Sequence, residues 1–228
     1  METPTDRFIR PLTRSHRVVV LRGLAVIAHG YSRSTYDGDV WLDPMKDAAE
    51  WCAALEKACA EFGGLVLQRL PGWVPVSGGD LVDAVEETGM VRIHGLDCPL
   101  DVFRKPNEFE IGEFDGVCAR AVPRGDGTLL PDPLDLIQSK LETGRDKDRQ
   151  DIMHLESVVR ADYKRRLPVA TLQEAEQLLG RYSEWEVLRS ALENPLLEIK
   201  ELAREHLREF AAAGDPFSLA ILEGRELP

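Results

Sequence analysis

The sequence of 228 residues predicts an α+β fold, in which a sheet flanked by helices is followed by an all-helical C-terminal module. Up to about residue 166, short apolar runs bounded by glycine or proline alternate with longer stripes of helical spacing, as is typical of strands alternating with helices. Beyond Pro168 every apolar stripe has helical spacing. We therefore expect a first domain over residues 1–166 and a helical module over residues 167–228.

The composition is that of a globular chain, with 43% hydrophobic and 30% charged residues. No apolar run is long enough to span a bilayer and the N-terminus lacks the apolar core of a signal peptide, so we expect a cytoplasmic protein without membrane contact. The net charge of −12 argues against general nucleic-acid affinity, because Lys and Arg must neutralise phosphates, but it is compatible with a local basic groove. The four cysteines form no CxxC pair and the five histidines no HxH or HxxxH pair, which argues against zinc.

The first elements follow from local patterns. Residues 1–16 are polar and contain two prolines, which predicts a loosely held arm with at most a short helix. The continuous apolar run Val18–Leu21 is typical of a buried strand. Gly23–His29 is expected to be a short helix that ends at Gly30, and Ser32–Leu42 a second strand.

The rest of the first domain is predicted in the same way. Asp43 as N-cap and Pro44 at the first helical position predict a helix that ends at Phe62. Strands are then expected at Leu65–Leu70, Ala84–Ile93 and Leu100–Phe103, and as a pair over Phe109–Val122 that turns near Asp115. A helix over Leu134–Leu141 follows, and helical periodicity resumes from Ile152.

The C-terminal module is expected to contain three amphipathic helical units. Thr171 and Glu174 have the spacing of a capping box at the start of the first unit. Apolar stripes of this kind more often form a core than a binding groove, so we interpret them as core.

Two aspartates in the predicted strand Ser32–Leu42 suggest chemistry. Asp37 and Asp39 project on the same face, with Gly38 on the other, because side chains alternate along a strand. Two carboxylates held side by side suit a hard divalent cation such as Mg²⁺. Gly23 opens a predicted helix, whose N-terminal N–H groups and partial positive charge suit a phosphate. The stretch therefore predicts a phosphate site beside a metal site.

Asp101 is a third carboxylate, placed inside the apolar strand Leu100–Phe103. A charge buried there costs several kcal/mol unless a partner or a metal ion compensates it. From the residues alone, a core aspartate paired with Arg92 or Arg104 is at least as well supported as a metal ligand. A DxD pair by itself is also weak evidence, since an acidic chain contains several by chance.

Together these residues resemble a known family. They occur in the order Gly23, Gly30-Tyr-Ser-Arg33-Ser-Thr35, Asp37-Gly-Asp39, Asp101, Lys140, Gly144-Arg145-Asp-Lys147-Asp148 and Asp151-Ile152. This order resembles the polymerase-beta-type nucleotidyltransferase superfamily, and it is most similar to the bacterial abortive-infection type, which includes toxin-like enzymes. The resemblance covers Val18 to Leu155 and implies a mixed sheet flanked by helices. Leu24 departs from the family pattern, which has Gly or Ser after the first glycine.

The resemblance implies an enzyme that uses two Mg²⁺ ions, or Mn²⁺, held by Asp37, Asp39 and Asp101. An acceptor hydroxyl would attack the α-phosphorus of a nucleoside triphosphate, pyrophosphate would leave, and Asp101 would help to take the proton. The nucleotide would be bound by Gly23, the backbone N–H of Leu24, Arg33, Thr35, Lys140 and Lys147.

Several of these roles have structural alternatives. Arg33 could instead pair with one of the metal-binding aspartates, and the two lysines could lie on a solvated helix face, with Lys140 the better candidate ligand of the two. Asp148 and Asp151 are expected to be supporting partners or surface groups.

The acceptor, which the sequence does not specify, could be an RNA end, a protein or a small molecule; a cationic small molecule would suit the acidic chain. The basic run Arg160–Arg166 could guide RNA, but an ordinary solvated helix end is the favoured interpretation. The alternative function is an inactive nucleotidyltransferase-fold protein that binds a partner or senses nucleotides, as in a toxin–antitoxin pair. Leu24 supports that alternative, and the acidic C-terminal helices would then offer the surface for a protein partner.

Overall fold

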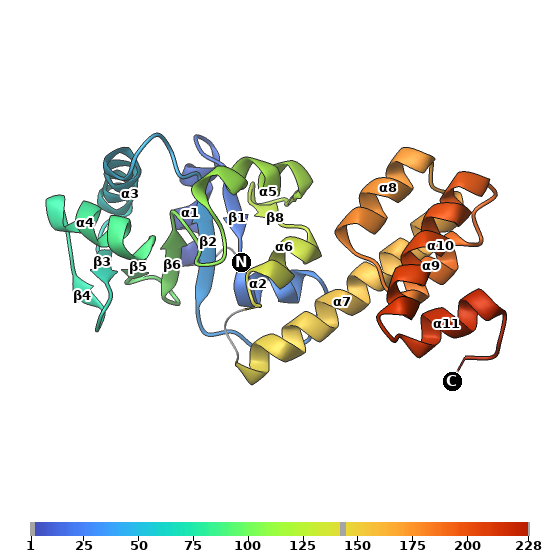
Figure 1. Cartoon of the computed structure of the whole chain (residues 1–228). Coiled ribbons are helices and arrows are strands. Elements are labelled where there is room, and N and C mark those ends of the chain that lie inside the picture. Colours follow the sequence, from blue (N-terminus) through green and yellow to red (C-terminus); the bar gives the residue numbers. More distant parts are fainter. Residues whose placement is uncertain (1–2, 142–144, 228) are drawn as a thin grey trace. The chain divides into compact units, whose positions relative to one another are not determined.

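The computed structural model describes residues 3–141 and 145–227 (Figure 1). The chain forms two compact units, residues 1–155 and residues 156–228, which we call unit 1 and unit 2. The division falls inside helix α7 (Asp146–Arg166), whereas the sequence pattern placed a domain boundary at the C-terminal end of this helix.

Unit 1 is built on a mixed sheet, as expected. In the described part of the chain its eight strands have the order β4-β3-β5-β6-β2-β1-β8-β7. They are β1 (Val18–Val20), β2 (Gly38–Leu42), β3 (Val66–Arg69), β4 (Val74–Pro75), β5 (Met90–His94), β6 (Leu100–Phe103), β7 (Val122–Pro123) and β8 (Leu129–Leu130). The pairs β1–β8 and β2–β6 are parallel and the other pairs antiparallel. This arrangement, with a helical C-terminal region, confirms the mixed α+β class.

Helices flank this sheet (Figure 1). Those that start in unit 1 are α1 (Pro4–Thr13), α2 (Arg22–Ala28), α3 (Ala48–Phe62), α4 (Gly79–Thr88), α5 (Phe114–Arg120), α6 (Pro133–Gln138) and α7, together with a short 3-10 turn over Ile111–Glu113. Helices α1, α3 and α4 share one core with the β-residues Val40 and Val102. Helix α5 shares another core with Trp41 and Phe103, which point to the opposite face because side chains alternate along a strand.

The N-terminal segment differs from the expected loose arm. Thr3 and Asp6 form a capping box at the start of α1, and Phe8 is only 2% exposed. Thr5 donates hydrogen bonds from its N and Oγ1 to Asp97 Oδ1, at 2.8 and 2.6 Å. The short helix is confirmed as α1, but the expected loose attachment was wrong, because the apolar residues of this stretch share one helix face that is buried in the core.

Two segments predicted as strands are helical in part or for most of their length. Ala84–Ile93 contains the end of α4 and the start of β5, separated by Gly89, whose φ of 71° is the left-handed conformation that ends a helix. Phe109–Val122 contains the 3-10 turn and α5. The helix predicted to begin at Asp43 begins later, since the N-cap of α3 is Asp47.

The other strands and helices predicted for unit 1 are confirmed with small shifts in their ends. The segments at Val18–Leu21, Leu65–Leu70 and Leu100–Phe103 are β1, β3 and β6, and the short helix after Gly23 is α2. The strand predicted from Ser32 begins only at Gly38, so Asp37 lies just before β2.

Over residues 156–227, unit 2 contains the end of α7, a short 3-10 turn over Leu167–Val169 and four further α-helices. They are α8 (Leu172–Arg181), α9 (Trp185–Ala191), α10 (Leu197–Ala212) and α11 (Pro216–Glu223). Thr171 is the N-cap of α8. Leu178, Leu179, Ile199 and Leu207 of the apolar stripes are buried, as expected for a core, whereas Leu172 and Leu196 are exposed. Asn194 is also buried and donates hydrogen bonds to Leu167 O and Ala170 O. Across the described ranges, no helix has both the length and the apolar character needed to cross a membrane.

Candidate functional site

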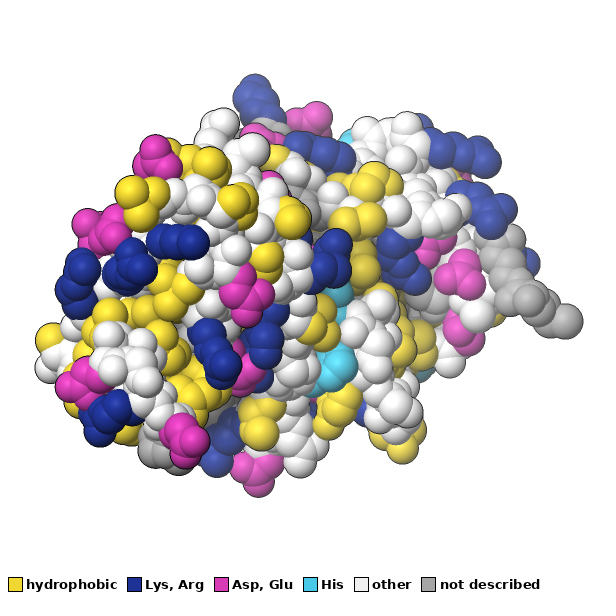
Figure 2. Space-filling view, turned by 90° about the vertical axis from the view of Figure 1, so that its right-hand side faces the viewer, with side chains coloured by type: hydrophobic (Ala, Val, Ile, Leu, Met, Phe, Trp, Pro, Cys, Tyr) yellow, Lys and Arg dark blue, Asp and Glu magenta, His cyan; other side chains and the backbone are white. Residues whose placement is uncertain are grey.

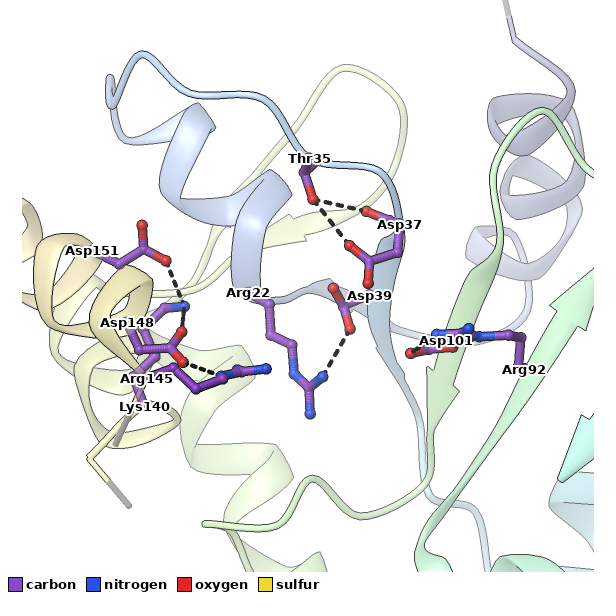
Figure 3. A network of polar contacts seen from close by, with 10 residues as sticks. All are labelled: Arg22, Thr35, Asp37, Asp39, Arg92, Asp101, Lys140, Arg145, Asp148 and Asp151. Atoms are coloured by element: carbon purple, nitrogen blue, oxygen red, sulfur yellow. Dashed lines mark hydrogen bonds and ion pairs between the residues drawn. The ribbon is translucent and has the colours of Figure 1, made fainter. Parts of the chain in front are cut away.

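Strand pairing brings two of the three predicted carboxylates together. In the parallel pair β2–β6, Asp39 and Asp101 are direct neighbours in register, and Gly38 lies opposite Leu100. A Cβ atom at Gly38 would come within 2.9 Å of Leu100 Cδ1, so a glycine lets the two strands pack closely. Asp37 joins them from the residue before β2 (Figure 3). We call Asp37, Asp39 and Asp101 the aspartate row.

Of the two buried carboxylates in this row, Asp39 is the less compensated one. It is 2% exposed, and its closest cation is Arg22, with Nη1 3.3 Å from Asp39 Oδ1. This contact is an ion pair without hydrogen-bond geometry, and Asp39 Oδ1 accepts no hydrogen bond from the described residues. Burial raises the pKa of Asp39 to about 7, with Arg22 opposing the rise and the neighbouring aspartates adding to it. A buried carboxylate in this state favours a proton or a cation.

Asp101 has, by contrast, a complete partner. Arg92 Nε donates to Asp101 Oδ1 at 2.6 Å and Arg92 Nη2 to Asp101 Oδ2 at 2.9 Å. Arg92 is the cross-strand neighbour of Asp101 on β5 and also stacks on Trp73, with 3.7 Å between the guanidinium carbon and the ring centroid. The hydrogen bonds from Arg92 to Asp101 raise the pKa of Arg92. Of the two arginines considered as partners, Arg92 is therefore the one that binds, while Arg104 donates to Pro44 O.

Gly23, Arg33 and Thr35 meet at the start of α2. Thr35 Oγ1 lies 3.1 Å from Asp37 Oδ1 and 3.2 Å from Asp37 O, and it can donate its hydrogen to either. A Cβ atom at Gly23 would come within 2.7 Å of Thr35 Oγ1 and 3.0 Å of Arg33 Nη2. The glycine is thus required because the segment carrying Thr35 packs directly on it.

Lys140 belongs to a buried ion cluster. Its Nζ donates to Asp148 Oδ1 at 3.1 Å and to Asp151 Oδ2 at 2.8 Å, and Lys140 is 3% exposed. Arg33 Nη2 also binds Asp151 Oδ2, at 3.0 Å, and Arg145 Nε binds Asp148 Oδ2, at 2.5 Å. We call these five residues the Lys140 cluster. Figure 3 shows its members Lys140, Arg145, Asp148 and Asp151 across from the aspartate row.

The Lys140 cluster settles three alternatives. Lys140 is buried, which contradicts a solvated helix face for this residue, while Lys147 is exposed in the first turn of α7. Arg33 pairs with Asp151 and not with a carboxylate of the aspartate row. Asp148 and Asp151 are supporting partners, as expected. Gly144, part of the motif, lies outside the described residues.

Leu24, the departure from the family pattern, points away from the aspartate row. Its side chain lines a cavity of about 250 Å³ together with Val20 and Val40. It also lies on the side of β2 to which Gly38 belongs, since Leu24 Cδ1 is 3.7 Å from where a Gly38 Cβ would be. Asp39 faces the other way by strand alternation. The leucine side chain therefore leaves the space beside Asp39 unfilled.

Sequence reasoning missed Arg22. Its φ of 47° is left-handed, which is uncommon for a residue other than glycine. Its guanidinium carbon lies 4.7 Å from the centroid of the Phe103 ring, and its side chain points into the space between the aspartate row and the Lys140 cluster (Figure 3). The only sequence signal was a basic residue directly before Gly23.

The basic run at the end of α7 is neutralised within unit 2. Arg160 forms two hydrogen bonds with Glu184, Lys164 binds Glu186 and Arg166 binds Glu174. On the face drawn in Figure 2, basic side chains are interspersed with acidic and hydrophobic ones. Paired cations of this kind support the interpretation of an ordinary helix end.

The donor set of the aspartate row fits a hard cation in part. Asp39 has an oxygen without a hydrogen bond, and Asp37 lies two residues away on the same side of the chain. Both oxygens of Asp101 are held by Arg92, so Asp101 would join only by exchanging that partner. Within residues 3–141 and 145–227, no three His, Cys, Asp or Glu side chains are already gathered as a metal site.

No protein-family model matches the chain, and no curated protein matches it. The function of the chain is therefore inferred from the geometry of its residues and from the resemblance of its motifs.

Proposed function

We propose that unit 1 is a metal-dependent nucleotidyltransferase of the polymerase-beta type, acting in the cytoplasm. It transfers a nucleoside monophosphate from a nucleoside triphosphate to a hydroxyl acceptor on RNA, protein or a small molecule. The observation that carries the proposal is the register of β2 and β6, which places Asp39 beside Asp101 with Asp37 one step before β2. The incompletely compensated charge of Asp39 supports it further.

Asp37 and Asp39 would hold Mg²⁺, which would supply positive charge to stabilise the transferred phosphoryl group. The acceptor oxygen forms a new bond to the α-phosphorus, and the bond from that phosphorus to the bridging oxygen breaks, so pyrophosphate leaves with the electron pair. Asp101 takes the proton of the acceptor hydroxyl. Because Arg92 occupies both oxygens of Asp101, this step requires that the pair loosens when the acceptor binds.

The remaining residues bind the triphosphate or position the site. The backbone N–H groups of Gly23 and Leu24 face the phosphates at the start of α2, while Lys147 provides an exposed cation. Lys140 lowers the electrostatic penalty on Asp39 from its buried position. Arg33 and Thr35 fix the segment that presents Asp37.

The test is nucleotidyl transfer by the full chain with each of four α-³²P-labelled nucleoside triphosphates, Mg²⁺ or Mn²⁺, and RNA, protein or small-molecule acceptors. Label should reach an acceptor with the wild type and with Asp83→Asn, a control on the exposed face of α4. Asp39→Asn should lower the rate by roughly 100-fold or more, since several kcal/mol of transition-state stabilisation are lost. An equal rate in Asp39→Asn and Asp83→Asn would contradict the proposal.

The arginine pairs of the aspartate row favour a second candidate, an inactive member of a toxin–antitoxin pair that binds a partner or senses nucleotides. Arg92 and Arg22 supply to Asp101 and Asp39 the positive charge that metal ions would otherwise supply. Unit 2 exposes Val169 by 83% and Leu197 by 64%, which suits a protein partner on the C-terminal helices. Calorimetry and the transfer assay together separate the candidates: no heat with nucleoside triphosphate and Mg²⁺ up to millimolar ligand favours the partner-binding protein, heat without label transfer favours the nucleotide sensor, and heat with label transfer supports the enzyme.

A further inference from the structure

Arg22 and Arg92 are both counter-ions of the aspartate row, but they hold their carboxylates differently. Arg92 makes two hydrogen bonds to Asp101 and is stacked on Trp73. Arg22 makes one contact of 3.3 Å to Asp39, without hydrogen-bond geometry, and its side chain is 32% exposed. A single contact of this kind is much weaker than a bidentate pair.

We propose that Arg22 is an exchangeable counter-ion: it occupies Asp39 in the empty site and moves to the phosphates of the incoming nucleotide, which frees Asp39 for the divalent cation. This inference rests on the proposed function, and it makes the nucleotide and the cation bind cooperatively. Arg22 is a positioning residue, since it sets when Asp39 becomes a ligand.

The exchange follows from charge and geometry. A guanidinium and a divalent cation repel each other and compete for Asp39 Oδ1, so each lowers the affinity of the other for this oxygen. A triphosphate offers Arg22 a better partner, because the guanidinium fork matches phosphate oxygens in a bidentate way. The coupling is reciprocal, so the cation must also favour the nucleotide.

The surroundings of Arg22 allow this movement. Its guanidinium lies over the Phe103 ring and points into the space that separates Asp39 from Lys140 and Arg145 (Figure 3). Lys140 and Arg145 are both held by Asp148 and stay in place. A phosphate that enters the space therefore meets these two fixed cations and the loosely held Arg22. The left-handed φ of Arg22 aims the side chain there at a backbone cost of roughly 1 kcal/mol.

The experiment measures two affinities without catalysis. Mn²⁺ binding is followed by electron paramagnetic resonance of the free ion, and binding of an α,β-methylene nucleoside triphosphate by calorimetry in EDTA. The variants are Arg22→Gln, the charge-conserving Arg22→Lys, and Arg14→Gln, which removes one exposed positive charge elsewhere in unit 1. Thermal unfolding checks that each variant is folded.

The two affinities should change in opposite directions in Arg22→Gln. Without nucleotide it should bind Mn²⁺ about 10-fold more tightly than the wild type, and it should bind the analogue about 10-fold more weakly, as expected for one charge-assisted contact. Arg22→Lys should lie between, and Arg14→Gln should match the wild type.

Two results overturn the inference. If the wild type binds the analogue and Arg22→Gln leaves either affinity unchanged, Arg22 does not exchange, although the proposed function stands. If the wild type binds no nucleotide either in EDTA or with Mg²⁺ present, the proposed function fails and the exchange fails with it.

Discussion

Two groups of buried charge lie in unit 1, and they are balanced differently. In the Lys140 cluster, three cations surround two carboxylates at distances of 2.5 to 3.1 Å. In the aspartate row, Asp101 is saturated by Arg92, whereas Asp39 has only the loose contact with Arg22. Asp39 and Asp101 in the row are as deeply buried as Asp148 and Asp151 in the cluster. The comparison teaches that incomplete compensation, more than burial, distinguishes a candidate ligand site from a structural ion cluster.

The largest effect on stability should come from breaking the Lys140 cluster. Lys140→Met leaves Asp148 and Asp151 buried with less compensation, so we expect a loss of about 3–5 kcal/mol in the free energy of unfolding. Urea denaturation followed by circular dichroism measures it. Lys147→Met is the control, because it removes an exposed lysine from the first turn of α7, the helix that carries Asp148 and Asp151, and it should change the stability by less than about 0.5 kcal/mol. Equal losses in both variants would show that the cluster is not structural.

In the aspartate row, removing a charge should raise the free energy of unfolding instead of lowering it. The pKa of Asp39 is raised from 3.8 to about 7, so the folded state binds a proton that the unfolded state has lost, and stability falls as the pH rises between these values. Asp39→Asn should remove this pH dependence and stabilise the chain at pH 8 by up to a few kcal/mol. Denaturation in EDTA from pH 5 to pH 8 measures both. A destabilised Asn variant at pH 8 would mean that Asp39 is fully compensated.

The smallest effect should come from the exposed end of the row. Thr35→Val removes the hydroxyl that can donate to Asp37, which water can replace because Asp37 is only partly buried, so we expect a loss of about 1 kcal/mol or less. Ser34→Ala, the exposed neighbour, should have no measurable effect. If the two variants differ by more than about 2 kcal/mol, Asp37 depends on Thr35 more strongly than on a hydrogen bond that water can replace.

Local patterns predicted the strands of continuous apolar residues and the glycine that opens α2. They failed where one apolar stretch spans two elements, as in Ala84–Ile93, where α4 ends and β5 begins. They also failed at residues 1–16, because an amphipathic helix with few apolar residues resembles a polar arm until its core is known.

Some features of the candidate site could likewise be predicted from the sequence, and others could not. Three aspartates could be selected from strand context, but the choice of Arg92 over Arg104 depends on the cross-strand register of β5 and β6, which a single sequence does not encode locally. The contact between Arg22 and Asp39 depends on a left-handed backbone angle that has no marker in the sequence. The role of Lys140 required α7 to bring two aspartates to it.

The register of β2 and β6 also has a consequence for the order of assembly during synthesis. Asp39 leaves the ribosome well before Asp101, its strand neighbour, so it stays hydrated and ionised until β6 emerges and pairs with β2. The Lys140 cluster closes later, because Arg33 must wait for Asp151. A nascent chain that ends between these two points can carry the aspartate row before the cluster exists, and long-range closure of this kind slows folding. The order of the residues along the chain therefore allows the aspartate row to form before the Lys140 cluster that faces it.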